Sequence, residues 1–238
     1  MKNEIAILMA AGLGSRMLPL TEKVPKPLIK VFGKSMIETI IDALEVRGVK
    51  HIYIVVGYKK EQFEFLQSKY PNVTLIENQE YTIKNNISSI YAVADIIGKE
   101  NCFICEADLY VADSSIFEAN LTRSCYYGKM VQGWSDDWGF NLNQDGRIVR
   151  VGKGVESTYN MVGVSYFTSD DAKKLSAAIK NAYRESGHEN LFWDEVVDKE
   201  LGNINLSIHP IVEGQIYELD SVSDLQKVDP DYHRFTKI

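Results

Sequence analysis

Residues 10–27 read AAGLGSRMLPLTEKVPKP and follow directly on an apolar segment over residues 4–9. Glycines let a backbone approach a ligand closely and turn its N–H groups toward an anion. Arg16 adds positive charge at the end of the glycine run, and Lys26 adds a second charge ten residues later, between two prolines. The stretch therefore predicts a polyphosphate-binding turn at the carboxyl end of a first β-strand, in an α/β fold.

Two common phosphate-binding motifs resemble this stretch but do not match it. A dinucleotide-binding fingerprint requires a third glycine where helix and strand pack closely, and Met17 occupies that position. A P-loop ends in Gly-Lys-Ser/Thr, and residues 10–27 contain no such tripeptide. The remaining alternative is a glycine-rich turn without a ligand, which the nearby arginine and lysine disfavour. The pattern points to nucleotide chemistry outside the dehydrogenase and P-loop kinase classes.

Apolar segments of strand length alternate with segments of helical period through the first half of the chain. Strands are predicted over residues 4–9, 51–57, 73–78 and 102–107, with helices over 36–46, 60–68 and 87–97. This repetition predicts a doubly wound, mostly parallel, Rossmann-like sheet covered by helices. Ligands bind such sheets at the carboxyl ends of strands, where the glycine turn, Gly57-Tyr58 and Asp108 all fall. These segments should converge on one cleft.

The pattern changes after Asp108. Residues 124–168 predict antiparallel strands with a turn at 143–146. Helices over 169–185 and 193–199, short β segments over 206–210 and 216–219, and a last helix from 221 follow. We expect a single domain over residues 1–238, in which a nucleotide-binding half (about 1–110) adjoins an acceptor-binding half (about 111–238). The antiparallel extension and the C-terminal helices would form the acceptor side.

Composition narrows the classes of protein. The 26 Lys and Arg residues against 33 Asp and Glu give a net charge of −7, which argues against nucleic-acid binding. We see no charged-then-apolar leader and no apolar run near 18 residues, so neither export nor a membrane is expected. Three cysteines fit a reducing cytoplasm, and Cys102 and Cys105 read as core thiols within a strand rather than as a metal or redox pair.

Acidic residues end two predicted strands. Asp108 follows the strand over 102–107, and Glu218 and Asp220 lie on one face of the strand near residue 217. Mg²⁺ takes one or two carboxylates together with phosphate and water, so Asp108 and Asp220 would suffice, with Glu218 as a further candidate. For Asp220 the alternative is a helix N-cap.

The basic residues of the opening stretch complete a catalytic set with Asp108. Lys26 is expected to neutralise charge on the transferred α-phosphoryl group, and Arg16 to hold the departing pyrophosphate. A merely solvated lysine is the competing interpretation, but flanking prolines suit a positioned charge.

A polar segment, Asn85-Asn86-Ile87-Ser88-Ser89, opens a helix. One asparagine would serve as a helix cap, but two asparagines and two serines exceed that need, and amides can recognise the edge of a pyrimidine base. The residues that we expect at the nucleotide are Ala10, Ala11, Gly12, Gly14, Ser15, Tyr81, Asn86 and Ser89.

Aromatic residues concentrate in the second half. Trp138 follows two aspartates and Trp193 precedes Asp194. Aromatic faces beside carboxylates can hold a quaternary ammonium group, whereas plain core packing is the alternative.

Taken together, these motifs resemble the bacterial choline-phosphate cytidylyltransferases of the Lic type over nearly the whole chain. The motifs are AAGLGSR, Pro25-Lys26, Gly57-Tyr58 with 60–63, Asn85-Asn86-x-x-Ser89, Ala107-Asp108, 121–124, Trp138, Trp193-Asp194 and 216–222. The resemblance implies transfer of a cytidylyl group from CTP to phosphocholine, giving CDP-choline and pyrophosphate with Mg²⁺. It implies Asp108 and Asp220 as metal ligands and Lys26 at the phosphates. The acceptor-binding set is then Trp138, Phe192, Trp193, Asp194 and Tyr217. Leu109 stands where the family has Asn, and Phe192 where it has Tyr.

Other functions stay open from the sequence. The same chemistry could serve phosphoethanolamine, 2-aminoethylphosphonate or a sugar-1-phosphate, because Asp136, Asp137 and Asp194 could bind a primary ammonium group. A nucleotide-binding regulator without activity is the alternative from another class, although Lys26, Arg16 and Asp108 are all present. The choice of CTP over another pyrimidine triphosphate and the oligomeric state are not fixed by these residues.

Overall fold

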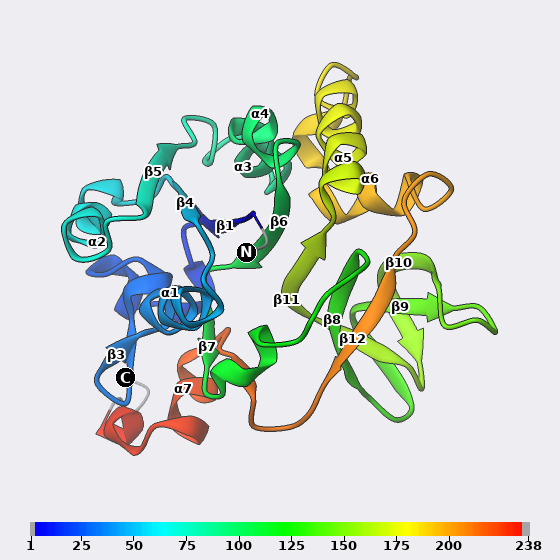
Figure 1. Ribbon diagram of the computed structural model, residues 1–238. Helices are drawn as coiled ribbons and strands as arrows, with labels where there is room; N and C mark the ends of the chain where they lie inside the picture. Colours follow the sequence, from blue (N-terminus) through cyan, green and yellow to red (C-terminus); the bar gives the residue numbers. More distant parts are fainter. Residues whose placement is uncertain (1–2, 235–238) are drawn as a thin grey trace.

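The computed structural model describes residues 3–234 and is built on one nine-stranded mixed sheet (Figure 1). Its parallel part has the order β6-β1-β4-β5. The strands are β1 (Glu4–Ala10), β4 (His51–Val56), β5 (Val73–Glu77) and β6 (Asn101–Glu106). Their apolar, β-branched sequences suit burial on both faces. The prediction of a doubly wound, mostly parallel sheet is confirmed.

An antiparallel extension continues the sheet beyond β6. The long strand β11 (Tyr159–Phe167) lies antiparallel to β6 and joins it to the remaining strands. These are β8 (Cys125–Met130), β9 (Trp134–Leu142), β10 (Ile148–Glu156) and β12 (Ser207–Ile211). Because β11 bridges the two halves, residues before and after position 110 share one sheet. The turn expected at 143–146 joins β9 to β10.

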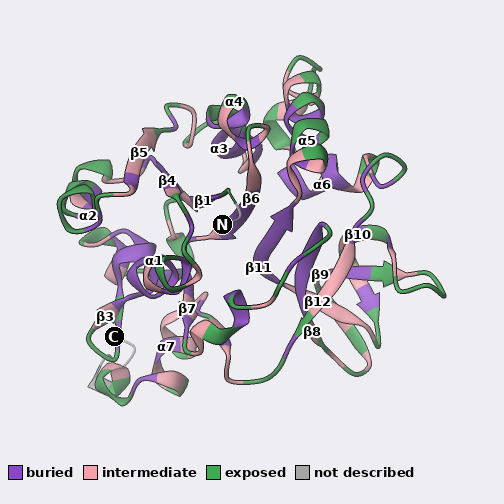
Figure 2. Cartoon of the chain, viewed as in Figure 1, coloured by how far each residue is buried: buried purple, intermediate pink, exposed green. Residues whose placement is uncertain are grey.

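Two apolar layers lie on opposite faces of the parallel strands. Figure 2 colours the buried positions of the strands and of the helices purple. Alternate residues of β1 point to opposite faces, so Ala6 and Leu8 join one layer and Ile5 and Ile7 the other. The first layer includes α1 (Met36–Arg47) and α2 (Glu64–Lys69). The second includes α3 (Ile87–Ala92), α4 (Ala94–Ile97), α5 (Ser169–Ala182) and α6 (Trp193–Lys199).

Two small ribbons lie outside the main sheet. One pairs β2 (Lys30–Val31) with β3 (Lys34–Ser35). The other pairs β7 (Leu109–Val111) with β13 (Ile216–Glu218), with Glu218 opposite Leu109, and precedes α7 (Val222–Val228). The strand β7 was not expected from the sequence. Its pairing matters for function, because it brings the chain just after Glu218 beside the chain just before Leu109.

Helix boundaries differ from the predictions in three places. The helix expected over 87–97 is divided at Val93 into α3 and α4. The helix expected over 60–68 begins as a 3₁₀ turn, Lys60–Phe63, before α2. The helix expected over 169–185 ends at Ala182. Sequence patterns indicate that a helix is present more reliably than they indicate where it begins and ends.

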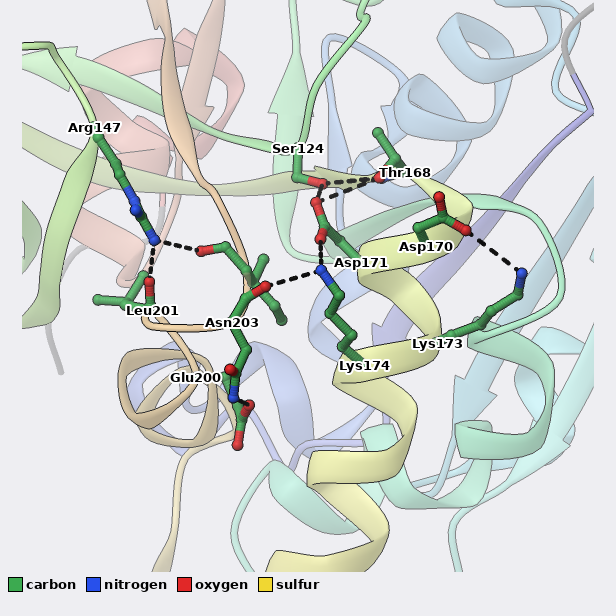
Figure 3. A network of polar contacts seen from close by, with 11 residues as sticks. Ser124, Arg147, Thr168, Asp170, Asp171, Lys173, Lys174, Glu200, Leu201 and Asn203 are labelled. Carbon is green, nitrogen blue, oxygen red and sulfur yellow. Dashed lines mark hydrogen bonds and ion pairs between the residues drawn. The ribbon is translucent and has the colours of Figure 1, made fainter.

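A polar network fastens α5 and the segment after α6 to the extension (Figure 3). Asp171 accepts hydrogen bonds from Ser124 Oγ at 2.6 Å and from Lys174 Nζ at 3.0 Å. Lys174 also donates to the Asn203 carbonyl at 2.9 Å, and Arg147 donates to the Leu201 carbonyl. Through these bonds the position of α6, which begins at the predicted acceptor residue Trp193, is tied to the sheet.

Two further features concern the cysteine thiols and the character of the helices. Cys102, Cys105 and Cys125 are buried free thiols, as a core role predicts, and burial raises their pKa values. Within residues 3–234, no helix combines the length and apolar character needed to cross a membrane.

Candidate active site

The glycine turn after β1 depends on two glycines that serve different purposes. Gly14 has φ +64°, and a Cβ atom there would lie 2.8 Å from Lys26 Cβ. The Gly14 carbonyl also accepts a hydrogen bond from Thr21 Oγ1 at 3.1 Å. At Gly12, by contrast, an added Cβ would have no heavy atom within 4 Å. Gly14 therefore makes room for Lys26, whereas Gly12 leaves open space for a ligand.

Lys26 is the centre of the polar site. It begins a 3₁₀ turn, Lys26–Leu28, and its side chain is only 7% exposed. Its Nζ lies 2.6 Å from Asp108 Oδ2 and 2.7 Å from Asp220 Oδ1, and Arg16 Nη2 lies 2.8 Å from the same Asp220 oxygen. Burial alone would lower the pKa of Lys26, but the charges and hydrogen bonds of the two aspartates outweigh it and raise that pKa. The ammonium group is therefore charged at neutral pH.

The two aspartates come from distant parts of the chain. Asp108 follows β6, and the pairing of β13 with β7 places Asp220 beside it. Ser221, not Asp220, caps α7, because the Ser221 Oγ accepts from the Asp224 N–H. The N-cap alternative for Asp220 is thus wrong. Within the described part of the chain, Asp108 Oδ1 is buried without a hydrogen-bond partner, so it can still ligate a cation.

Two adjoining cavities, of about 300 and 450 Å³, open at these strand ends. The first contains most of the predicted nucleotide and metal residues on its walls: Ala11, Gly12, Arg16, Tyr81, Asn86, Ser89, Asp108, Glu218 and Asp220. The second contains Ala10, Gly12, Gly14, Ser15, Arg16, Lys26 and Asp108. The structure therefore brings together every residue that was predicted to bind nucleotide or metal.

Three further residues line the first cavity but were not predicted as site residues from the sequence. They are Asn78, Lys84 and Glu106. Asn78 and Glu106 lie at the carboxyl ends of β5 and β6, so the strand-end rule could have found them. Lys84 lies in the irregular segment before α3, where its Nζ donates to Tyr183 Oη at 3.0 Å and pairs with Glu80. No periodic signal marks such a position.

Two glutamates make one end of this cavity acidic. Burial, with the nearby charges of Asp108, Glu218 and Asp194, raises the pKa of Glu106 well above its usual value. Desolvation, followed by the charges of Asp220 and Asp108, raises the pKa of Glu218 to about 7. A cationic group that entered this end of the cavity would relieve the repulsion among these carboxylates.

The polar segment before α3 is organised by side-chain hydrogen bonds. Asn78 Nδ2 donates to Ser88 Oγ at 2.9 Å and to Ser89 Oγ at 3.0 Å. Asn86 Oδ1 accepts from the Trp193 backbone N–H at 2.9 Å, so this oxygen is engaged by α6. Tyr81 packs so closely on Gly57 that a Cβ atom there would lie 2.7 Å from the ring.

The residues predicted to bind the acceptor differ in burial: some are half-buried and others lie in the core. Trp138 and Phe192 form a ring pair with centroids 5.3 Å apart, both half-buried. Trp193 is 3% exposed and packs in the core against Tyr126 and Phe167.

Asp194 and Tyr217 are also turned away from the cavity walls. Asp194 is buried, accepts a hydrogen bond from Tyr126 Oη at 2.9 Å, and has a pKa raised by burial to about 7. Tyr217 packs beside Tyr110 in a small apolar cluster around Met17. None of the five predicted acceptor residues contributes to the walls of the two cavities. Trp138, Phe192 and Tyr217 are half-buried, and of these Trp138 and Phe192 pair with each other.

A buried lysine shared by two aspartates, beside a glycine turn on a doubly wound sheet, is the arrangement expected of a nucleotidyltransferase active site. Residues 6–139 match the MobA-like NTP transferase domain. The chain is 54% identical to 2-aminoethylphosphonate cytidylyltransferase of Lancefieldella rimae, over 95% of this chain and 92% of that protein. It is 33% identical to choline-phosphate cytidylyltransferase of Streptococcus pneumoniae, over 94% and 96%.

Solved structures agree with these relationships. The CTP:phosphocholine cytidylyltransferase from Streptococcus pneumoniae superposes with a TM-score of 0.89 at 32% identity, covering 96% of this chain and 99% of that one. The inositol-1-phosphate CTP transferase from T. maritima has a TM-score of 0.77 at 18% identity, which shows the common fold. The chain belongs to the cytidylyltransferases of the MobA-like NTP transferase superfamily.

Proposed function

We propose that this enzyme transfers the cytidylyl group of CTP to 2-aminoethylphosphonate and releases pyrophosphate. The observation that carries the proposal is the 54% identity to a 2-aminoethylphosphonate enzyme over nearly the whole chain, against 33% for a choline-phosphate enzyme. The phosphocholine acceptor implied by the sequence resemblance thus becomes the second candidate. Both acceptors present a phosphorus oxyanion at one end and an ammonium group at the other, so the reaction is the same.

The shape of the acceptor side supports a primary ammonium group. A quaternary ammonium group has no N–H donor and is held by aromatic faces, whereas a primary one donates three hydrogen bonds to oxygen atoms. Of the aromatic residues that the resemblance implies at the acceptor, Trp193 lies in the core. Glu106 and Glu218 line the cavity beside Asp108 and offer carboxylate oxygens to a primary ammonium group, and the Trp138–Phe192 ring pair is left to flank the acceptor.

The reaction requires positioning and charge neutralisation more than proton transfer. A phosphonate oxygen, already anionic, attacks the α-phosphorus of CTP. A new P–O bond forms as the bond to the β-phosphate oxygen breaks, and the electron pair leaves with pyrophosphate. The backbone of the glycine turn and Arg16 would hold the triphosphate. Lys26, buried and charged, would neutralise the negative charge that develops on the transferred group.

The site also fits the Mg²⁺ ion that the family implies. The carboxylates of Asp108 and Asp220 both contact Lys26 Nζ and so lie side by side, and within the described chain Asp108 Oδ1 is buried and free of hydrogen bonds. Mg²⁺ is commonly held by one or two carboxylates with phosphate and water oxygens. Asp108 and Asp220 would hold the ion, and Glu218 lies on the same cavity wall. When bound, the metal would withdraw charge from the phosphates of CTP.

An acceptor panel tests the proposal. Pyrophosphate release is measured with CTP and Mg²⁺ and each of 2-aminoethylphosphonate, phosphocholine, phosphoethanolamine and glucose-1-phosphate. We expect kcat/KM for 2-aminoethylphosphonate to exceed that for phosphocholine at least tenfold, and a chelator to stop turnover. A preference for phosphocholine or a sugar phosphate would refute the acceptor assignment. Binding of CTP without turnover of any acceptor would favour the regulatory alternative.

A further inference from the structure

We propose that Asn86 is a positioning residue for the acceptor, which it affects through α6, rather than a reader of the nucleotide base. The inference rests on the proposed function and on the Trp138–Phe192 ring pair flanking the acceptor outside the two cavities, next to the wall that Asn86 contributes. Asn86 is the residue that directly precedes α3, yet its side chain makes no capping bond to that helix. Its Oδ1 instead accepts the N–H of Trp193, 107 residues further along the chain.

This bond fixes the backbone of Phe192. Trp193 is the first residue of α6, and the first N–H groups of a helix have no partner within it. Asn86 satisfies the N–H of the peptide group that follows Phe192. The N–H on the other side of Phe192 donates to Glu195 Oε2 at 2.8 Å. With both flanking peptide groups held, the Phe192 ring is directed at Trp138, 5.3 Å away between centroids.

A second set of hydrogen bonds, made by Asn85, links the same two segments. The Asn85 backbone N–H donates to the Glu189 carbonyl at 2.8 Å, and Asn85 Nδ2 donates to the Asn190 carbonyl at 3.1 Å. Asn85 Oδ1 also accepts the Asn86 N–H at 2.8 Å. Two consecutive asparagines thus join a wall of the nucleotide cavity to the segment that carries Phe192.

The amide of Asn86 has both an acceptor and a donor group, so this one side chain can contact α6 and also line the nucleotide cavity. Its oxygen accepts a hydrogen bond from α6, while Asn86 as a residue lines the cavity and has an NH₂ group as a second polar group. Removing the oxygen leaves the Trp193 N–H without its partner and releases the peptide group after Phe192. The acceptor should then lose a defined wall, while the glycine turn and the cationic residues that hold the triphosphate are unchanged.

The test separates the two substrates kinetically. For Asn86→Ala we expect the KM for the acceptor to rise about tenfold, as for a lost hydrogen bond at a half-buried position, and the KM for CTP to change less than about threefold. Asn86→Asp keeps an oxygen at the same place and should return the acceptor KM to within about threefold of wild type. Asn86→Ser, whose hydroxyl is too short to span the gap, serves as a second truncation and should behave like alanine.

A matched control comes from the opposite end of the sheet. Asn101 Oδ1 accepts the N–H of Ser169, the first residue of α5, at 2.8 Å, which is the same kind of bond away from the cavities. Asn101→Ala should lower the melting temperature but leave the acceptor KM within about twofold. A rise in KM for CTP alone after truncation of Asn86 would overturn the proposal. So would an Asn86→Asp enzyme that folds normally and keeps the high acceptor KM.

The acceptor in this test is whichever of 2-aminoethylphosphonate and phosphocholine the wild-type enzyme prefers. A wild-type preference for phosphocholine would refute the proposed function. The role of Asn86 would still be decided by the variants, because the Phe192 ring would face either acceptor.

Discussion

Replacing Gly14 by alanine should damage both stability and catalysis, whereas the same replacement at Gly12 should damage only CTP binding. The two glycines lie two residues apart in the same turn. At Gly14 the backbone is left-handed, with φ +64°, and a methyl group would lie 2.8 Å from Lys26 Cβ and 3.1 Å from Thr21 Cγ2. At Gly12 the same methyl group meets no protein atom within 4 Å.

The magnitude follows from two contributions at Gly14. A left-handed alanine costs about 1–2 kcal/mol. Crowding in a packed site costs a further ~1–3 kcal/mol, because the buried Lys26 stem has to move. A loss of roughly 2–4 kcal/mol corresponds to a fall in melting temperature of about 5–15 °C for a chain of this length. At Gly12 the loss of unfolded-state entropy favours alanine by about 0.4–1 kcal/mol where the backbone allows it.

The catalytic effect differs because the two methyl groups point at different partners. Displacement of Lys26 in the Gly14→Ala enzyme lengthens its 2.6 and 2.7 Å contacts with Asp108 and Asp220. We therefore expect kcat to fall about a hundredfold, as for loss of one positioned charge. Gly12 lines both cavities, so its methyl group would meet the triphosphate and raise the KM for CTP.

The assay pairs thermal unfolding with steady-state pyrophosphate release for both variants. A Gly14→Ala protein that melts within 2 °C of wild type, a margin set well below the roughly 5 °C minimum expected here, and keeps its kcat would refute the reasoning. So would a Gly12→Ala protein with unchanged KM for CTP, because the open space at Gly12 would then not be where the nucleotide lies.

Two further variants test the electrostatics of the site. Lys26→Met keeps the bulk of the buried side chain but removes its charge, so kcat should fall about 10²–10³-fold with a smaller change in KM for CTP, and an unchanged kcat in a pyrophosphate-release assay would rule out its transition-state role. Asp194→Asn should stabilise the protein more at pH 8 than at pH 5: burial raises the pKa of Asp194 from 3.8 to about 7, so the folded wild type loses stability as pH rises between those values, and asparagine does not titrate. Melting temperatures of the two proteins at both pH values measure this, and a difference that does not depend on pH would contradict it.

The sequence was most informative where chemistry requires particular residue types at particular strand ends. The glycine turn, Lys26 and Asp108 follow from local patterns, because parallel strands place their carboxyl ends at one edge. Asp220 could be found only as an acidic strand end. Its meeting with Asp108 depends on the ribbon of β7 and β13, and no local signal revealed β7, a strand of three residues.

The aromatic residues show the limit of such inference. Trp138 and Trp193 have similar sequence contexts, each beside an aspartate. The structure separates them because Trp193 begins α6 and points into the layer with Tyr126, whereas Trp138 lies on β9, near the edge of the sheet. Which face of an element is buried depends on its partners, and those partners are distant in sequence. The oxygen of Asn86 was unpredictable for the same reason, since its partner lies 107 residues away.

The position of Lys26 also explains how the carboxylates of Asp108 and Asp220 can lie side by side at the proposed cation site. Asp108 and Asp220 both lie within 2.7 Å of one ammonium nitrogen, which is itself almost entirely buried. Without that charge, two carboxylates at such spacing would repel each other. Lys26 therefore holds both groups in place before the substrates arrive, and in the proposed reaction the same charge would be available to the transferred phosphoryl group. Because the lysine is held by Gly14 and by the prolines on either side, little reorganisation remains for the reaction itself.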